Sequence, residues 1–293
     1  MGELGFQGIR FAAVGHVTND RLPQGLYPGG SALYAALAAA SMGASARIVT
    51  SFGRDFIGSD LLRSAGIHLD ASASDQTTTF EAVDSGGART WRVLCKASSI
   101  ATPVEQADIV FVCPVLAEVE PVCLRASPGT IVAAGLQGWL RVLGTDGLVE
   151  PREPKDLSFL RGCTALFCSD EDLAGNAARV LPVLLGLAKI VVVTEGPRGA
   201  VLYLDGHPHR VHAFPTLAAV DPTGAGDTFA TCFILALASG QGPLEAAVLG
   251  ACGASVTIEG PGAAAVGRLA ALDERVAWYR SHLPAPALIE PDR

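Results

Sequence analysis

Short apolar runs of strand length alternate with alanine-rich runs of helical length through most of the chain. This order is typical of a mainly parallel sheet covered by helices, because each parallel strand needs a crossover segment that brings the chain back. The pattern predicts strands at residues 10–15, 47–51, 108–113, 130–134, 165–168 and 190–194. It predicts helices at residues 31–42, 58–65, 176–187, 227–239, 243–256 and 268–281. We therefore expect an α/β fold.

Two stretches depart from this alternation. Residues 77–97 and 200–214 contain β-branched and aromatic residues around the glycine-containing turns Ser85-Gly86-Gly87 and Asp205-Gly206. Such segments form β-hairpins. The first hairpin interrupts the strand–helix order, so we expect it to leave the main sheet as a small lid. No low-complexity tract or charged linker divides the chain, and residues 1–293 are expected to form one domain.

The charge balance and the cysteines limit the kinds of partner. With 29 acidic and 21 basic residues the formal net charge is −8, which leaves no broad basic surface for nucleic acid or an anionic membrane. The seven cysteines are scattered and never spaced as CxxC, so neither a disulfide framework nor a zinc site is indicated. The N-terminal sequence lacks the features of a signal peptide. We expect a cytoplasmic protein that binds a small molecule.

A glycine-rich turn runs directly into an apolar helix at residues 221–229, DPTGAGDTF. Gly224 and Gly226 let the backbone approach a ligand closely. The unpaired N–H groups of the first helical turn, at the positive end of the helix dipole, form a site for an anion. Asp227 lies in that turn, where the dipole stabilises its carboxylate. The segment can therefore hold a phosphoryl group beside a carboxylate.

Phosphoryl transfer requires positioning, neutralisation of the phosphoryl oxygens and a base that accepts the proton of the attacking hydroxyl. The backbone of this turn supplies the anion site, and Asp227 supplies the base. Taken alone, a GxGD segment is better explained as a helix-capping aspartate with two turn glycines. The rest of the sequence favours the phosphate site, which differs in design from a Walker A loop because no GxxxxGK[ST] sequence occurs.

DPTGAGDTF resembles the C-terminal signature of the ribokinase-like (PfkB) carbohydrate kinases, whose pattern is close to D-x-x-G-A-G-D. Three further segments are similar to that family in the same order: Gly29-Gly30 at the start of the first long helix, SFGRDFIG at residues 51–58, and VTEGPRG at residues 193–199. The resemblance implies a ribokinase-like three-layer sandwich with a mainly parallel central sheet and a small β lid. It also implies an ATP-dependent kinase that uses Mg²⁺.

The resemblance assigns roles to individual residues. Asp227 is implied as the general base, and the N–H groups of Ala225, Gly226 and Asp227 are implied as the anion hole, with Gly224 as a further catalytic-loop residue. The residues that bind the acceptor are implied to be Asp20, Gly29, Gly30 and Ser31, and are called the acceptor side below. Asp20 is implied to accept hydrogen bonds from hydroxyl groups of the acceptor. The nucleotide side is implied to consist of Thr194, Gly196, Gly199 and Ser169. Asp172 is implied on the magnesium side, and Asp221 with Thr223 at a site for a monovalent cation such as K⁺.

Some positions depart from the family pattern. Family members usually carry an asparagine within the Gly-Gly helix start, where this chain has Ser31 and Tyr34. Their N-x-x-E motif appears here as Ser169-Asp-Glu-Asp172. Only about nine residues separate Asp20 from Gly29, whereas members with a full lid place two strands there. We therefore expect the lid to be reduced to the hairpin at residues 77–97.

A further similarity narrows the chemical class of the acceptor. The short connection after Asp20, GHVTND at residues 15–20 and QGWLR at residues 137–141 are similar to a branch that includes myo-inositol kinases. This similarity points to a sugar or cyclitol acceptor. A nucleoside kinase of the same fold is the nearest alternative, with Phe80 and Trp91 as candidate contacts for a base, and a non-catalytic ligand-binding protein is another. The sequence also leaves open whether the protein forms a homodimer.

Overall fold

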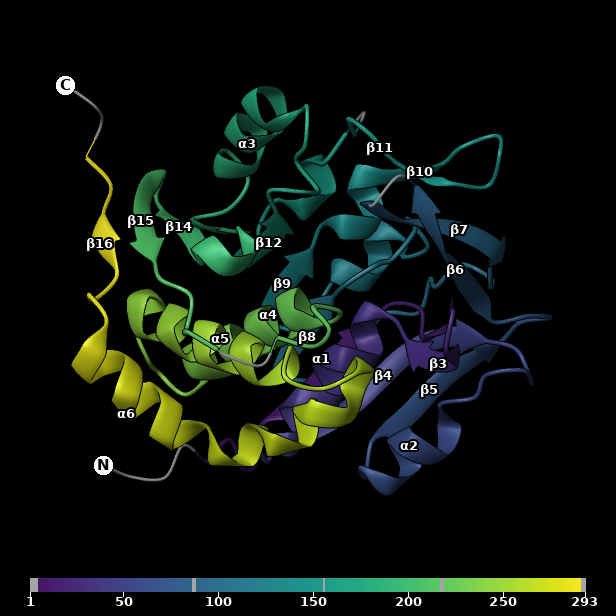
Figure 1. Ribbon diagram of the computed structural model, residues 1–293, viewed down its shortest axis with the longest axis horizontal. Coiled ribbons are helices and arrows are strands. Elements are labelled where there is room, and N and C mark those ends of the chain that lie inside the picture. Colours follow the sequence, from purple (N-terminus) through teal and green to yellow (C-terminus); the bar gives the residue numbers. More distant parts are fainter. Residues whose placement is uncertain (1–4, 86–87, 155, 217–218, 291–293) are drawn as a thin grey trace.

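The computed structural model describes residues 5–85, 88–154, 156–216 and 219–290, and a large central sheet dominates it (Figure 1). Seven strands run parallel: β1 (Arg10–Val14), β4 (Ser45–Phe52), β5 (His68–Ala73), β8 (Ile109–Val112), β9 (Ile131–Gly135), β12 (Ala165–Ser169) and β13 (Ile190–Thr194). Three antiparallel strands extend one edge: β14 (Ala200–Leu204), β15 (His207–Val211) and β16 (Ala287–Leu288). The order is β16-β15-β14-β13-β12-β9-β8-β1-β4-β5. All six predicted parallel strands and the predicted hairpin at residues 200–214 are confirmed.

Helices cover both faces of this sheet. The α-helices are α1 (Ser31–Ser41), α2 (Ser59–Ser64), α3 (Ala177–Leu185), α4 (Ala225–Ala238), α5 (Pro243–Thr257) and α6 (Leu272–His282). The 3₁₀ segments are η1 (Pro121–Leu124), η2 (Gln137–Leu140), η3 (Ser158–Leu160), η4 (Gly196–Arg198) and η5 (Gly262–Ala271). The last predicted helix starts later than residue 268, because η5 precedes it. The glycines in η5 disfavour α-helix there.

Two hydrophobic cores show that the fold has three layers. Alternate residues of a strand point to opposite faces, so Phe11 and Ala13 pack with α1, α4, α5 and α6. Ala12 and Val14 pack on the other face with α3 and the 3₁₀ segments η1 to η3. In the part of the chain that is described, no helix is both long and apolar enough to cross a membrane.

A second sheet of four strands forms the lid at one side of the molecule (Figure 1). Its strands are β2 (Thr18–Leu22), β3 (Gly25–Gly29), β6 (Thr78–Ser85) and β7 (Ala88–Cys95), in the order β3-β2-β6-β7. The two paired strands predicted within residues 77–97 are confirmed, whereas Gly86 and Gly87 of the predicted turn lie outside the described residues. The expectation of a lid reduced to that hairpin is wrong. The short segment from Asp20 to Gly29 still forms two strands because both residues belong to the strands themselves and only a tight turn joins them.

A small hairpin that the sequence did not predict joins the lid to the main body. Its strands β10 (Arg141–Leu143) and β11 (Val149–Pro151) pair with each other. The turn between them reaches β7, where the Val93 N–H group donates to the Gly147 carbonyl at 2.9 Å. A bridge between Arg92 and Leu148 continues this pairing. The position of the lid is thereby tied to the segment that begins at Arg141.

Candidate active site

Residues 221–227, called the anion loop below, turn sharply into α4. Gly224 precedes the helix with φ +79° and ψ 0°, a left-handed conformation that favours glycine. The Ala225 N–H group donates to the Pro222 carbonyl at 3.2 Å, whereas those of Gly226 and Asp227 have no backbone acceptor among the described residues. A Cβ atom on Gly226 would meet no atom of the described residues within 4 Å. The loop therefore offers two N–H donors next to open space, as an anion site requires.

The carboxyl group of Asp227 lies in the first turn of α4, largely enclosed by protein but with partial access to solvent. Burial raises the pKa of Asp227 to about 7, because removing water disfavours the charged form. A hydrogen bond from Ser31 lowers this pKa, the charge of Asp172 raises it, and the charge of Arg141 lowers it. A carboxyl group with a pKa near neutrality can accept a proton and later release it, which suits a general base.

Asp20 and Gly29 lie against each other on paired lid strands. A Cβ atom on Gly29 would lie 2.7 Å from the Asp20 carboxyl carbon and 2.9 Å from Thr18 Oγ1. The Thr18 hydroxyl donates to Asp20 Oδ1 at 2.7 Å and thereby orients the carboxylate. Thr18 is a contributor that the sequence analysis missed, and its only signal was its position two residues before Asp20. The glycine is required here because the carboxylate occupies the space of a side chain.

Gly30 and Ser31 connect this acceptor side to Asp227. Gly30 has φ +94°, and a side chain there would run into the backbone of residues 16–18. Ser31 is the first residue of α1 and is buried, and hydrogen bonding from its hydroxyl lowers the pKa of Asp227. The predicted acceptor-side residues are thus brought together with the predicted base.

The predicted nucleotide-side residues lie at the ends of neighbouring parallel strands. Ser169 ends β12, Thr194 ends β13, and the two residues are paired in register. Gly196 and Gly199 follow in the next turn with φ +55° and +91°, and a side chain on Gly199 would overlap the backbone of residues 211–213. The carboxyl ends of parallel strands are where open α/β sheets bind ligands.

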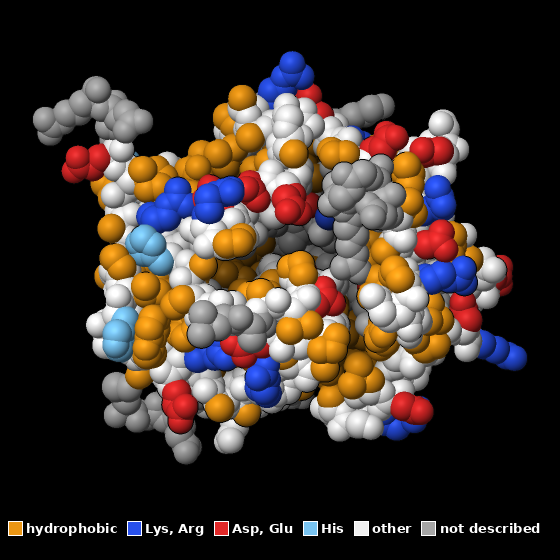
Figure 2. All heavy atoms as spheres, in the orientation of Figure 1, with side chains coloured by type: hydrophobic (Ala, Val, Ile, Leu, Met, Phe, Trp, Pro, Cys, Tyr) orange, Lys and Arg blue, Asp and Glu red, His pale blue; other side chains and the backbone are white. Residues whose placement is uncertain are grey.

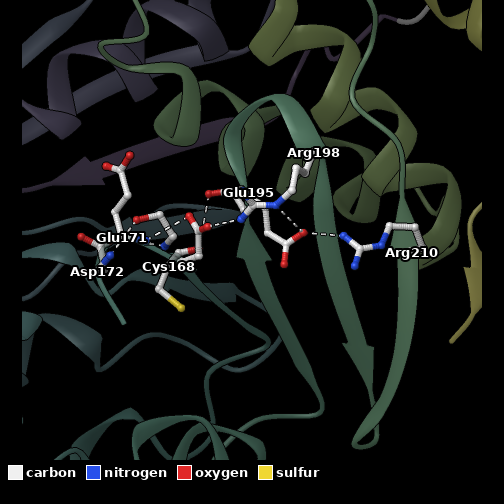
Figure 3. Close-up of polar contacts among 9 residues, drawn as sticks. Cys168, Glu171, Asp172, Glu195, Arg198 and Arg210 are labelled. Atoms are coloured by element: carbon white, nitrogen blue, oxygen red, sulfur yellow. Dashed lines mark hydrogen bonds and ion pairs between the residues drawn. The ribbon is translucent and has the colours of Figure 1, made fainter. Parts of the chain in front are cut away.

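A chain of charged side chains links the loops on this side (Figure 3). Arg198 pairs with Asp170, and its Nε atom lies 3.8 Å from Glu195 Oε2. Arg210 of β15 pairs with the same Glu195 carboxylate. These pairs tie the loop after β12 to the turn after β13, so the two segments that carry the predicted nucleotide-side residues are held together.

Asp172 forms a reciprocal pair with Ser169. The Ser169 N–H group donates to Asp172 Oδ2 at 3.0 Å, and the Asp172 N–H group donates to Ser169 Oγ at 3.0 Å. The Asp172 side chain is only 5% exposed, and an Arg141 guanidinium nitrogen lies 3.4 Å from its Oδ1 atom. Arg141 also donates to the side-chain oxygen of Gln137 at 2.7 Å when that amide is oriented to suit. Asp172 has the oxygen chemistry that Mg²⁺ prefers, but it shares its charge with Arg141.

The described residues contain no group of three or more His, Cys, Asp and Glu side chains that could hold a metal ion by themselves. A Mg²⁺ ion at Asp172 would therefore depend on donor phosphates for its other ligands, as Mg²⁺ sites in kinases commonly do.

Asp221 anchors the start of the anion loop. Its Oδ1 atom accepts from the Thr223 N–H group at 3.0 Å and from the Thr223 hydroxyl at 2.6 Å. Its Oδ2 atom accepts from the Gly262 N–H group at 3.0 Å. A monovalent cation at Asp221 and Thr223 would share the carboxylate with these donors.

The segment at residues 51–58 holds the root of the lid. Asp55 Oδ1 accepts from the Thr77 N–H group at 2.9 Å and from the Thr77 hydroxyl at 2.7 Å. Asn19 of β2 donates to the Asp55 carbonyl at 3.0 Å. The similarity of this segment to the family loop therefore reflects attachment of the lid, just before β6 begins.

A second clamp at the root of the lid is formed by His16, whose ring is fully buried. Its Nε2 atom lies 2.9 Å from the Ser98 carbonyl, which can only accept, so Nε2 carries the proton in the neutral ring. Nδ1 then accepts from the Thr78 hydroxyl at 2.8 Å, and Thr78 Oγ1 accepts from the Ala97 N–H group at 2.9 Å. Both ends of the β6–β7 hairpin are thus fixed to the same histidine.

The face of the lid that carries Asp20 is aromatic. Asp20 and Phe80 are paired in register and so share a face, and the Trp91 ring lies 6.1 Å from the Phe80 ring, nearly perpendicular to it. A cavity of about 200 Å³ lies between the lid and the β10–β11 hairpin, with Trp91, Arg141, Val149 and Asp172 among its walls. Figure 2 shows a hollow near the centre of the face in view, with acidic and basic side chains around it. Arg141 was noted in the sequence only as part of QGWLR and was given no role.

Comparisons with known proteins agree with this geometry. A family model described as pfkB family carbohydrate kinase matches residues 23–268. The chain is 29% identical over 266 residues to a cytidine kinase of Thermococcus kodakarensis, a match that covers 82% of this chain and 92% of that protein. It is 50% identical over 60 residues to an inositol 3-kinase of Oryza sativa subsp. japonica, which covers 20% of this chain and 15% of that protein.

Solved structures share the fold. A pyrophosphate-dependent kinase in the ribokinase family, solved with a pyrophosphate analog and myo-inositol, superposes with a TM-score of 0.71 at 19% sequence identity. The superposition covers 86% of this chain and 96% of that one. The expected ribokinase-like fold is therefore confirmed.

Proposed function

Because this chain belongs to the pfkB family of carbohydrate kinases, we propose that it transfers the γ-phosphoryl group of ATP to a hydroxyl group of a sugar or cyclitol. The observation that carries the proposal is the pairing of a carboxyl group whose pKa is about 7, Asp227, with the open N–H groups of Gly226 and Asp227. Together they place a base beside an anion site.

In the proposed reaction Asp20 accepts hydrogen bonds from acceptor hydroxyl groups, and the missing side chain at Gly29 leaves the space that the Asp20 carboxylate occupies. Asp227 then removes the proton of the attacking hydroxyl as its oxygen bonds to the γ-phosphorus. The bond from that phosphorus to the β–γ bridging oxygen breaks, and ADP leaves with the electron pair. The hydrogen bond from Ser31 keeps the Asp227 carboxylate in place.

The donor is proposed to lie along Ser169, Thr194, Gly196 and Gly199, with its terminal phosphate at the anion loop. N–H groups of the loop would stabilise the negative charge that spreads over the phosphoryl oxygens. A Mg²⁺ ion at Asp172 would neutralise further charge on the phosphates. We propose that a K⁺ ion binds at Asp221 and Thr223, where it would stabilise the conformation of the anion loop.

A nucleoside acceptor is the second candidate, because the Phe80–Trp91 pair shares the lid face with Asp20. A base attached to a ribose held by Asp20 could stack on these rings. One relative, matched over 266 residues, is described as a cytidine kinase.

We also propose the cytoplasm as the location, supported by seven free cysteines, six of them buried. A homodimer is proposed only by analogy with the family.

A direct test is a screen in which purified protein and MgATP are incubated with individual sugars, cyclitols and nucleosides. Phosphorylated products are identified by mass, and pyrophosphate replaces ATP in a parallel series. We expect one acceptor class to be phosphorylated well above the rate of ATP hydrolysis. Absence of acceptor-dependent product with either donor would contradict the proposal, and product formed only from pyrophosphate would contradict ATP as the donor.

A further inference from the structure

Tyr34 lies beneath the anion loop. It belongs to α1, which packs against α4 (Figure 1), and its side chain is only 2% exposed. Ser31 lies three residues earlier on the same helix, so the two side chains project from one face. Ser31 reaches Asp227, and Tyr34 reaches Gly224. One face of α1 thus contacts both ends of the turn that leads into α4.

The contact between Tyr34 and Gly224 is unusually close. A Cβ atom on Gly224 would lie 2.5 Å from Tyr34 Cε1 and closer still to Cγ and Cδ1. The loop backbone therefore rests directly on the tyrosine ring, with no space for a side chain between them. Packing this dense resists displacement, because moving the loop toward the ring produces overlap and moving it away leaves a void.

The loop is supported at a second point by Asp221, whose carboxylate accepts from Thr223 and from the Gly262 N–H group. Gly262 also borders Tyr34, since a Cβ atom there would lie 3.8 Å from the tyrosine hydroxyl oxygen. The ring of Tyr34 and the carboxylate of Asp221 thus hold the anion loop at different points. Only the tyrosine does so from the helix that also carries Ser31.

We propose that Tyr34 is a positioning residue for phosphoryl transfer. Contact with its ring fixes the position of the Gly224 backbone and thereby the positions of the Gly226 N–H group and the Asp227 carboxylate. This inference rests on the proposed function. Tyr34 is almost fully buried and meets the loop through its ring, so its proposed role is to support the loop rather than to bind a ligand. Its loss therefore affects turnover more than binding, because a displacement of about 1 Å at reacting groups can lower a rate by about 10².

The first test compares Tyr34→Phe with Tyr34→Leu. The phenylalanine variant keeps the ring on Gly224, so its kcat should stay within about threefold of the wild-type value. The leucine variant loses the flat ring, so kcat should fall about 10- to 100-fold while KM for donor and acceptor changes by less than about threefold. Equal kcat in the leucine variant and the wild type, or a loss seen only in KM, would overturn the proposal.

The second test is a double-mutant cycle with Gly224→Ala. In the wild-type background the new methyl group overlaps the tyrosine ring, whereas in a Tyr34→Ala background only the backbone strain at φ +79° remains. The loss in the free energy of unfolding should therefore be smaller in the double variant than the sum of the losses in the two single variants. Additive losses would mean that the two residues are not in contact and would remove the basis of the inference.

The two tests also separate this inference from the proposed function. The denaturant cycle needs no substrate, so it reports the contact even if the wild type phosphorylates none of the acceptors in the screen. If the wild type is active and the cycle is non-additive but Tyr34→Leu turns over normally, the contact is structural only and the positioning role is refuted. Should Tyr34→Ala fail to fold, Tyr34→Leu replaces it in the cycle.

Discussion

The hydroxyl group of Ser31 lies close enough to the carboxyl group of Asp227 to lower its pKa by hydrogen bonding, and this links the first turns of α1 and α4. Ser31 follows the two glycines that border the acceptor side, and Asp227 follows the loop proposed to hold the phosphoryl group. The hydrogen bond lowers the pKa of Asp227, whereas burial raises it to about 7. The protonation of the proposed base is therefore set by a balance that substitution of Ser31 should change.

We expect kcat/KM for the acceptor to increase with pH up to a plateau above about pH 7, because only the ionised form of Asp227 accepts a proton. Ser31→Ala removes a hydrogen bond that stabilises the ionised form, so the midpoint of the profile should shift to higher pH. Ser31→Thr keeps the hydroxyl and is the matched control. The measurement is the pH dependence of initial rates, and an unchanged midpoint in Ser31→Ala would exclude Asp227 as the titrating group.

The same pKa predicts an effect on stability. The folded pKa lies above the ordinary value of 3.8, so the unfolded carboxyl group ionises first and the protein loses stability as pH rises from about 4 to 7. Asp227→Asn should therefore be more stable than the wild type by about 1–3 kcal/mol at pH 8, with a smaller difference at pH 5. Urea unfolding at several pH values measures this, and a difference independent of pH would contradict it.

The parallel strands could be predicted because each is a short buried apolar run, and the anion loop because its glycines and aspartate are adjacent in the sequence. The lid was predicted incompletely. Residues 77–97 carry strong strand signals, but β2 and β3 contain Asp20, Pro28 and two glycines, which are unfavourable in strands. The β10–β11 hairpin was missed because each strand has three residues, too few for a periodic pattern.

Contacts between distant segments account for the rest of the site. The pairing of Ser31 with Asp227 and the packing of Tyr34 on Gly224 depend on how α1 meets α4, which no local pattern determines. The sequence marked Tyr34 as a departure from the family pattern, and its burial against Gly224 became visible in the fold. The position of Arg141 beside Asp172 likewise follows from the fold rather than from spacing.

Asp20 should determine acceptor binding. Asp20→Ala removes a carboxylate proposed to accept hydrogen bonds from hydroxyl groups, so KM for the acceptor should rise about 10- to 100-fold while KM for ATP stays the same. Thr18→Val should have a smaller effect in the same direction, because Thr18 only orients that carboxylate through its 2.7 Å hydrogen bond. Steady-state kinetics with each substrate varied in turn measures both. A rise in KM for ATP in either variant would contradict the assignment of Asp20 to acceptor binding.

Thr78 should couple stability to closure of the lid. Thr78→Val leaves the buried Nδ1 atom of His16 and the buried Ala97 N–H group without their partner, which should cost about 1–3 kcal/mol. A looser lid also admits water, so more ATP should be hydrolysed per acceptor phosphorylated. Thr79→Val is the matched control, because among the described residues the Thr79 hydroxyl bonds to the nearby Thr77 carbonyl and to no other group. If both variants hydrolyse the same amount of ATP per acceptor phosphorylated, the hydrogen bonds of His16 have no role in closing the lid.

Two variants of the anion loop separate its two proposed tasks. Gly226→Ala adds a methyl group where no protein atom lies within 4 Å, so folding should be unaffected while the phosphoryl group loses space. We expect Gly226→Ala to lower turnover and also to weaken binding of ATP. Gly242→Ala is the matched control, because its Cβ would also meet no atom within 4 Å and it lies away from the loop. Isothermal titration with a non-hydrolysable ATP analogue measures the binding, and normal affinity together with normal turnover in Gly226→Ala would contradict a phosphate site at this position.

Asp227→Asn removes the base but leaves the loop backbone unchanged. Turnover should fall by about 10²–10⁴, the range for loss of a positioned general base, while affinity for the ATP analogue changes little because the anion site consists of N–H groups. If Asp227 served only to cap α4, asparagine would replace it without loss, since both residues cap helices about equally well. Near-normal turnover of Asp227→Asn on an acceptor that the wild type phosphorylates would therefore rule out the proposed mechanism, whereas lost turnover with intact nucleotide binding would assign Asp227 to the chemical step.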